Sequence, residues 1–288
     1  MRVADLVGRT VAQLGVGHAF GVVGSGNFAV TNALRAAGVP FTAARHEGGA
    51  ATMADAHART SGRVGVLTVH QGCGLTNAMT GIAEAAKSRT PLLVLAADTG
   101  GSAVRSNFRI DQDSLVRSVG AVPERVHSAH SAVADTVRAW RTARNGRRTV
   151  VLNLPLDVQA LPAPEGTPDA VVAPARPAPV RPGEEAVAAL AEELLRAQRP
   201  VFVAGRGARG AGAVLRELGA QAGALLATSA VAHGLFAGDP FDLGISGGFS
   251  SPLTAELVTG AVLVVSPLPI VGGTGSPARV FALVERGL

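Results

Sequence analysis

The chain has 288 residues, enough for about two domains of ordinary size, and 47% of them are hydrophobic. No apolar run approaches the roughly 20 residues that span a bilayer, which argues against a membrane partner. The N-terminus, Met1-Arg2-Val3-Ala4-Asp5-Leu6-Val7, carries an early acid and lacks an uninterrupted apolar core, so it is not typical of a cleaved signal peptide. We therefore expect a globular, cytoplasmic protein.

The formal net charge of +5 raises the question of nucleic-acid binding. Residues 1–165 hold 17 basic and 11 acidic residues, while residues 166–288 hold 9 and 10, so the excess lies in the first part. Five of these basic residues cluster at the end of one predicted helix: Arg138, Arg141, Arg144, Arg147 and Arg148. Cations there complement the helix dipole and solvate an outer face, so we expect no nucleic-acid partner.

Cys73 is the one cysteine of the chain. A single cysteine excludes a disulfide within the chain and a metal site built from several cysteines. We expect its small side chain to be buried, and we predict no metal ligands in this sequence.

Strands and helices alternate over residues 1–161. Apolar residues at helical spacing predict a helix over 3–14, and a short strand over 18–23 follows. This strand ends in Gly24-Ser25-Gly26-Asn27, a turn that lets the backbone approach a ligand before a helix over 28–37. The alternation continues with strands over 41–44, 64–69, 91–97 and 149–154, and with helices over 47–60, 75–87 and 131–144. This order predicts an α/β fold in three layers, with a parallel sheet covered on both faces.

Residues 99–120 are less regular and include a short predicted helix over 112–119. A long loop within a compact domain often serves as a functional lid or a contact segment.

The composition changes after residue 161. Prolines over 162–183 are too dense for a helix or a central strand, which predicts a semi-rigid linker. A partial second domain is predicted over 184–288, with a helix over 184–197 and strands over 200–204, 224–228 and 261–266, followed by a short tail from Pro267. Residues 205–210 form a G-x-G-x-x-G between a strand and a helix, but no acid follows the next strand to bind a ribose hydroxyl. We interpret this motif as a tight turn in an incomplete nucleotide-fold (Rossmann-like) domain.

Four segments in the first domain together resemble a known family. They are Phe20-Gly21-Val22-Val23-Gly24-Ser25-Gly26-Asn27, Arg45-His46-Glu47-Gly48-Gly49-Ala50, Gly72-Cys73-Gly74-Leu75-Thr76-Asn77-Ala78 and Thr90-Pro91-Leu92-Leu93-Val94. In this order and spacing they resemble the N-terminal pyrimidine-binding domain of the thiamine-diphosphate enzymes of the acetolactate synthase, pyruvate oxidase and 2-oxoacid decarboxylase group. Residues 184 to about 266 resemble the start of that group's central domain, which in some members binds FAD.

The resemblance implies that Glu47 is the catalytic glutamate. A carboxyl group hydrogen-bonded to N1′ of the aminopyrimidine favours the tautomer that can remove the weakly acidic C2 proton of thiamine, and the cofactor then serves as electron sink. Ala50, Ala51, Ala54 and Ala58 follow at helical spacing and would pack tightly around this site. The alternative is that Glu47 only stabilises the start of a helix, where acids are favoured.

The same resemblance places the cofactor's pyrimidine against two glycine loops. The first holds Gly24, Ser25, Gly26 and Asn27; the second holds His70, Gln71, Gly72, Gly74 and Asn77. Some decarboxylases of the group carry an active-site histidine near the position of His70, and a loop histidine is a poised acid or base near neutral pH. For the glycines alone, simple turn geometry is the alternative.

Two departures from the family pattern limit what the resemblance implies. Arg109 stands where acetolactate synthases typically carry the glutamine of Phe-Gln-Glu, which leaves the 2-oxo acid substrate and the reaction, decarboxylation or carboligation, open. The Gly-Asp-Gly motif that binds Mg²⁺ and the diphosphate is absent from the sequence. We therefore expect a split subunit or a truncated product that meets a diphosphate-binding domain in a homodimer or hetero-oligomer. The rival hypothesis is a non-catalytic interaction or regulatory module that retains the fold.

Overall fold

The computed structural model describes residues 1–167, 170–178, 180–266 and 279–282. The chain divides into two compact units, Met1–Ala178 and Pro179–Leu288. None of the helices in the described part is both long and apolar enough to cross a bilayer.

A six-stranded sheet forms the centre of the first unit, in the order β2-β1-β3-β4-β6-β5. Its strands are β1 (Ala19–Gly21), β2 (Phe41–Ala43), β3 (Gly65–Val69), β4 (Leu92–Asp98), β5 (Val122–Arg125) and β6 (Thr149–Pro155). Every pairing in this sheet is parallel. Strands β3, β4 and β6 are buried along their whole length, as parallel strands under helices on both faces must be.

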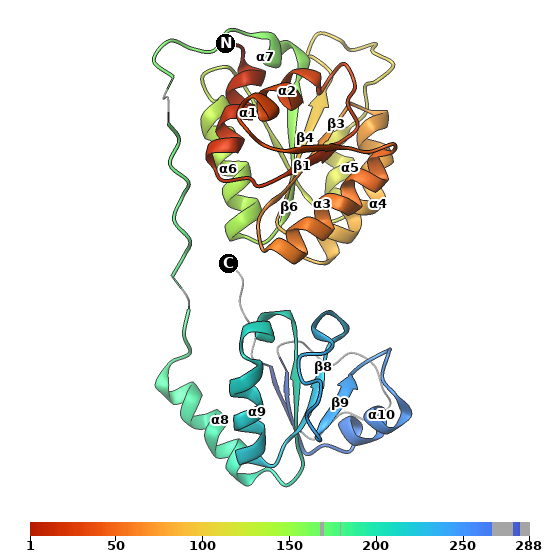
Figure 1. Ribbon diagram of the computed structural model, residues 1–288, viewed down its shortest axis with the longest axis vertical. Helices are drawn as coiled ribbons and strands as arrows, with labels where there is room; N and C mark the ends of the chain where they lie inside the picture. Colours follow the sequence, from red (N-terminus) through yellow and green to blue (C-terminus); the bar gives the residue numbers. More distant parts are fainter. Residues whose placement is uncertain (168–169, 179, 267–278, 283–288) are drawn as a thin grey trace. The chain divides into compact units, whose positions relative to one another are not determined.

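Helices cover both faces of this sheet (Figure 1). They are α1 (Val3–Gln13), α2 (Phe28–Ala36), α3 (Glu47–Ser61), α4 (Cys73–Lys87), α5 (Gln112–Ser118), α6 (Ala132–Asn145) and α7 (Leu156–Ala160). One hydrophobic core lies beneath α1, α2 and α6, and a second lies beneath α3, α4 and α5. The predicted three-layer α/β fold is thus confirmed.

Helices α3 and α4 approach each other through small side chains. A Cβ added to Gly81 would lie 2.5 Å from the Cβ of Ala51, so α4 needs glycine at this crossing. The four predicted alanines of α3 are all buried: Ala50, Ala51, Ala54 and Ala58. This close packing brings the start of α3, and with it Glu47, beside the start of α4.

Two elements of the first unit were not predicted from the sequence. Strand β5 is only partly buried and lies at the edge of the sheet, where Pro123 removes no central hydrogen bond. Its charged residues Glu124 and Arg125 interrupt the apolar pattern that predicts a strand. Helix α7 is a short segment of five residues.

The second unit contains a five-stranded parallel sheet in the order β11-β10-β7-β8-β9. Its strands are β7 (Pro200–Ala204), β8 (Leu225–Thr228), β9 (Asp242–Ile245), β10 (Leu263–Ser266) and β11 (Arg279–Ala282). Its helices are α8 (Glu184–Arg196), α9 (Gly212–Ala222) and α10 (Pro252–Thr259), with 3₁₀ turns η1 (Arg206–Gly210) and η2 (Ala230–Ala232). A partial second α/β domain is therefore present, and the G-x-G-x-x-G segment forms η1 before α9.

The predicted tail lies mostly outside the described residues, which omit 267–278 and 283–288. Strand β11 within it pairs in parallel with β10 and was not predicted. The predicted linker also includes positions outside the described residues, namely 168–169 and 179. Its described part contacts the first unit: the Val171 N–H donates to Gln13 Oε1 at 3.1 Å, and Arg144 Nη1 donates to the Pro174 carbonyl at 3.0 Å.

A buried carboxylate, Asp135, ties the start of α6 to the preceding loop. It accepts hydrogen bonds from the His127 backbone N–H (2.9 Å), the Ser131 hydroxyl (2.8 Å) and Arg138 Nη1 (2.7 Å). Burial disfavours the charged form, but these hydrogen bonds outweigh it and hold the pKa of Asp135 below its ordinary value.

Asp135→Asn should therefore lower the free energy of unfolding by about 2 kcal/mol at pH 7, because charge-assisted hydrogen bonds are lost. A carboxyl whose pKa is lowered on folding stabilises the protein above its unfolded pKa of about 3.9, and this contribution disappears as pH falls through the folded pKa. The difference in the free energy of unfolding between wild type and variant should thus shrink below about pH 4. Urea unfolding followed by Trp140, the single tryptophan, measures it. A difference that stays constant down to pH 2.5 or so would contradict this assignment. Asp5→Asn, at the exposed start of α1, is the control.

Candidate functional site

The loops that follow β1 to β4 share one edge of the first sheet, because parallel strands place their carboxyl ends together. The first glycine loop follows β1, Glu47 follows β2, and the second glycine loop follows β3. The two glycine loops and Glu47, which are separate in the sequence, therefore lie at the same edge of the sheet.

Glu47 is the first residue of α3, directly after the N-cap His46. The imidazole Nδ1 of His46 accepts a hydrogen bond from the Gly48 N–H at 3.0 Å, so the histidine caps the helix and leaves the Glu47 carboxylate available. Asn77 Nδ2 donates to Glu47 Oε2 at 3.1 Å. Oε1 of the half-buried Glu47 has no hydrogen-bond partner among the residues described. The simple capping interpretation of Glu47 therefore does not account for its side chain.

Asn27 organises the first glycine loop from within. It is fully buried and accepts a hydrogen bond from the Gly24 N–H (2.8 Å), while its amide nitrogen donates to the Val22 carbonyl and to Thr68 Oγ1, both at 3.1 Å. Since every polar group of its side chain is used in this way, Asn27 shapes the loop. Ser25 is exposed at the loop's surface.

His70 connects the two glycine loops. Its Nδ1 lies 2.9 Å from the Gln71 carbonyl oxygen, which can only accept, so Nδ1 carries a hydrogen. In the neutral ring Nε2 is then an acceptor, and the Ser25 hydroxyl at 3.3 Å donates to it. The Phe108 ring packs edge-on against the imidazole, with ring centroids 4.9 Å apart.

Gly74 lies between His70 and Glu47. A Cβ placed on it would be 2.9 Å from the His70 Cβ and 3.5 Å from Glu47 Oε1. Glycine at this position therefore leaves room between these two predicted site residues.

Gln71 lies beneath the surface that the other site residues form. Its side chain is buried and its Oε1 has no hydrogen-bond partner. A Cβ on Gly26 would lie 1.8 Å from that oxygen, so glycine is needed for the first loop to pack over Gln71. In this structure the contribution of Gly26 and Gln71 is to hold the two loops together.

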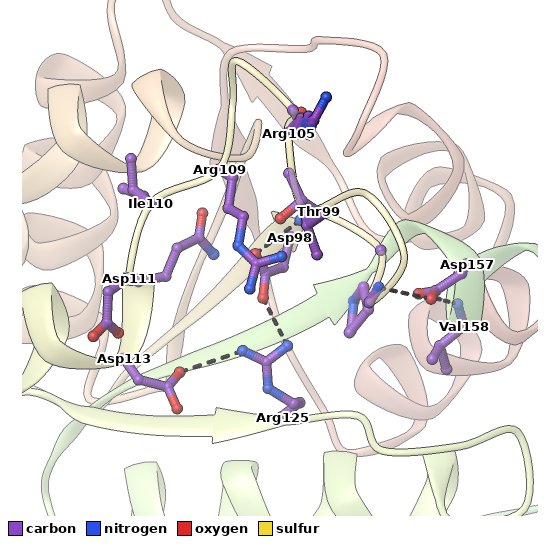
Figure 2. A pocket seen from close by; sticks show the side chains of 16 residues that line it. Asp98, Thr99, Arg105, Arg109, Ile110, Asp111, Asp113, Arg125, Asp157 and Val158 are labelled. Carbon is purple, nitrogen blue, oxygen red and sulfur yellow. Dashed lines mark hydrogen bonds and ion pairs between the residues drawn. The ribbon is translucent and has the colours of Figure 1, made fainter.

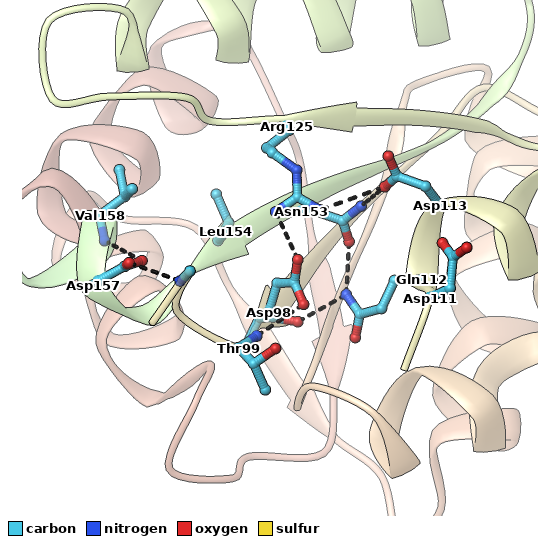
Figure 3. A network of polar contacts seen from close by, with 12 residues as sticks. Asp98, Thr99, Asp111, Gln112, Asp113, Arg125, Asn153, Leu154, Asp157 and Val158 are labelled. Carbon is cyan, nitrogen blue, oxygen red and sulfur yellow. Dashed lines mark hydrogen bonds and ion pairs between the residues drawn. The ribbon is translucent and has the colours of Figure 1, made fainter. Parts of the chain in front are cut away.

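A polar network that the sequence analysis missed supports the second loop (Figure 3). The Gln112 side chain is buried and accepts a hydrogen bond from the Gly72 N–H at 2.9 Å; it also donates to the Ala97 carbonyl (3.1 Å) and to Asn153 Oδ1 (2.7 Å). Asn153 Nδ2 in turn donates to Asp113 Oδ1 at 2.7 Å. The one local signal was an asparagine inside the otherwise apolar strand β6.

A pocket of about 880 Å³ opens beside this network, at the carboxyl ends of β4, β5 and β6 (Figure 2). Its walls come from residues 99–113 of the predicted irregular segment 99–120, together with Asp98, Arg125 and residues 155–158. The contact or lid role of that segment stays a prediction.

Cys73 was predicted to be buried, and this prediction is wrong. It is the first residue of α4 and is exposed. Its neighbours Gly72 and Gly74 are the buried positions of this turn. The helix therefore points Cys73 outward, on the same side as Asn77.

Comparison with known proteins gives this site a family context. The family model described as the N-terminal TPP binding domain of thiamine pyrophosphate (thiamine diphosphate) enzymes matches residues 1–115. This range includes Glu47, both glycine loops and the segment that carries Arg109.

Three curated proteins illustrate what this chain is similar to. A probable 2-ketoarginine decarboxylase of Pseudomonas aeruginosa is 34% identical over 83% of this chain and 44% of its own length. The acetolactate synthase large subunit of Lactococcus lactis is 32% identical over 73% of this chain and 37% of its own length. An uncharacterized 42.6 kDa protein of Pseudomonas amyloderamosa is 31% identical over 97% of this chain and 70% of its own length.

The chain spans less than half the length of the first two relatives. The range of the family model, residues 1–115, nevertheless includes Glu47 and both glycine loops. The chain therefore belongs to the family of thiamine pyrophosphate-dependent enzymes, and its first unit contains that family's N-terminal TPP binding domain over residues 1–115.

Proposed function

We propose that this chain supplies the pyrimidine-facing side of a thiamine-diphosphate site in an enzyme that decarboxylates or ligates a 2-oxo acid. The arrangement of Glu47 carries the proposal. Asn77 orients one carboxyl oxygen, and the other faces the open surface beside Gly74 and His70.

The residues present fit this cofactor. When bound, thiamine diphosphate supplies the reactive carbon and the electron sink. The Asn77 amide donates to Glu47 Oε2, so a proton on the carboxyl group resides on Oε1, the oxygen available to a ring nitrogen. Glu47 can thus hold a proton at Oε1 and exchange it with the pyrimidine N1′, while Gly74 leaves room for the ring.

The printed names of the relatives support the substrate class and leave the reaction open. One relative is named as a probable decarboxylase of a keto acid, and another as a synthase. We propose a 2-oxo acid as the common substrate class and retain both reaction types.

The diphosphate requires a second binding surface. We propose that a domain carrying Mg²⁺ binds it, on this polypeptide or on another, and that the complete site forms in a homodimer or hetero-oligomer. The half-exposed carboxylate of Glu47 and the exposed Ser25 and Asn77 support this, because they leave the sheet edge free to receive such a domain.

Calorimetry tests the divided site. Titration of thiamine diphosphate with Mg²⁺ into this chain should give no saturable heat at micromolar cofactor, and saturable binding should appear once a polypeptide carrying the diphosphate-binding domain is added. Tight binding of the cofactor with turnover of pyruvate by this chain alone would refute the proposal that a second domain is needed to bind the diphosphate. Failure to bind in the presence of the added domain would instead favour a non-catalytic interaction module.

A further inference from the structure

The pocket at the carboxyl ends of β4, β5 and β6 is separate from the Glu47 carboxylate and has no role in the proposed cofactor chemistry. Its lining includes three arginines and four aspartates: Arg105, Arg109, Arg125, Asp98, Asp111, Asp113 and Asp157. The state of each charge decides what the pocket can bind.

Two of these aspartates are committed to one arginine. Arg125 Nη1 donates to Asp98 Oδ2 at 2.6 Å, and its Nη2 lies 3.6 Å from Asp113 Oδ1. Asp113 also receives the hydrogen bond from Asn153. Arg117 Nη2 also lies 3.7 Å from Asp113 Oδ2, so these two carboxylates are matched by two guanidinium groups.

The other two aspartates bind backbone groups. Asp111 caps α5 by accepting from the Ser114 N–H at 2.9 Å, and Asp157 Oδ2 accepts from the Gly101 N–H at 2.9 Å. All four carboxylates therefore have partners within the protein.

Neither Arg105 nor Arg109 has a side-chain hydrogen bond or ion pair with a residue that the structure describes, and Arg109 is the one that follows Phe108 of the segment beside the second glycine loop. Its backbone N–H donates to the Ser106 carbonyl at 3.0 Å, which sets the loop, but its guanidinium has no hydrogen bond or ion pair with any residue that the structure describes. Figure 2 shows its side chain pointing into the pocket.

The position of Arg109 is coupled to the second glycine loop through its neighbour. The Phe108 ring contacts His70, and the Phe108 carbonyl would lie 2.4 Å from a Cβ on Gly72. Arg109 thus directly follows, in the sequence, a residue that packs on the proposed cofactor site.

We propose that this pocket is a subsite for the carboxylate of a small organic acid, and that Arg109 is its specificity-determining residue. A guanidinium presents a planar fork that matches a carboxylate through two parallel hydrogen bonds. The four surrounding aspartates repel a highly charged ligand, which favours a monocarboxylate over a diphosphate. The identification of this acid as the 2-oxo acid substrate rests on the proposed function. The binding of a carboxylate in the pocket does not.

Nuclear magnetic resonance titration of the cofactor-free chain tests this subsite, with pyruvate as the probe and Arg Nε–H signals as the readout. Pyruvate should shift the signal that Arg109→Gln removes, and this variant should bind pyruvate at least about tenfold more weakly. Arg109→Lys should lose affinity as well, since it keeps the charge but not the fork. Neutral methyl pyruvate should not shift the signal.

Arg35→Gln is the matched control, because it removes an exposed arginine on α2, away from the pocket. It should bind pyruvate as the wild type does. Equal affinity in Arg109→Gln and wild type, equal shifts with methyl pyruvate, or displacement of pyruvate by stoichiometric diphosphate would each overturn the proposal. The titration contains no cofactor, so its outcome does not bear on the proposed role of Glu47, which the Glu47→Gln variant tests separately.

Discussion

Replacement of Glu47 by Gln should lower kcat by about 10²- to 10⁴-fold in the enzyme assembled with its diphosphate-binding domain. The glutamine amide keeps the size of the carboxyl group, and its oxygen can still accept the hydrogen bond from Asn77. It cannot hold and release a proton at the position of Oε1. Steady-state kinetics with a 2-oxo acid measure the loss, and the urea unfolding curve should remain that of the wild type.

Glu84→Gln provides the control for this experiment. Glu84 is an exposed acid on the neighbouring helix α4, where it pairs with Arg59 at 3.0 Å. Exposed ion pairs contribute little to stability, so the variant should fold and turn over normally. Unchanged kcat in Glu47→Gln would remove Glu47 from the mechanism.

The parts of the fold that were predictable from the sequence are those with strong local periodicity. The alanines of α3 recur at helical spacing, and the central strands β3 and β4 are mostly apolar. Two of the edge strands, β5 and β9, lack such a signal. β9 (Asp242–Ile245) is only partly buried and contains Gly244 at a positive φ, so its sequence does not alternate as a strand should.

The candidate site was predictable only in part, because some of its contacts join residues that are distant in the sequence. Glu47 and the glycine loops lie in recognisable segments, whereas the support of the second loop depends on contacts between distant residues. Gln112 bonds to Gly72, forty positions away, and to Asn153, forty-one positions away. Nothing in the local pattern around Gln112 distinguishes a buried, fully bonded side chain from an exposed one at the start of a helix.

The polar network also explains why the second loop can hold an unfavourable backbone. Gly72 adopts φ 62° and ψ −105°, and its N–H is held by the buried Gln112. A side chain at this position faces the Phe108 carbonyl, which belongs to the segment that lines the pocket. The glycine therefore joins the proposed cofactor surface to the proposed carboxylate subsite.

Gly72→Ala should destabilise the first unit by about 3 kcal/mol or more. The backbone conformation costs a residue with a Cβ about 1–3 kcal/mol, and the clash with Phe108 adds a similar amount. Relief of the clash requires the Phe108 segment to move, which should also abolish its contact with His70. Urea unfolding followed by Trp140 fluorescence measures the first effect, because the single tryptophan lies in the first unit.

Gly62→Ala measures the cost of a left-handed backbone conformation in the absence of a clash. Gly62 ends α3 with a similar φ of 69°, but a Cβ there meets nothing within 4 Å. Its cost should be about 1 kcal/mol, the penalty for a left-handed conformation alone. If both variants lose the same stability, the Phe108 contact contributes nothing and the two surfaces are not joined through Gly72. A His70 resonance that shifts in Gly72→Ala and stays unchanged in Gly62→Ala would show that the packing of Phe108 on Gly72 couples them.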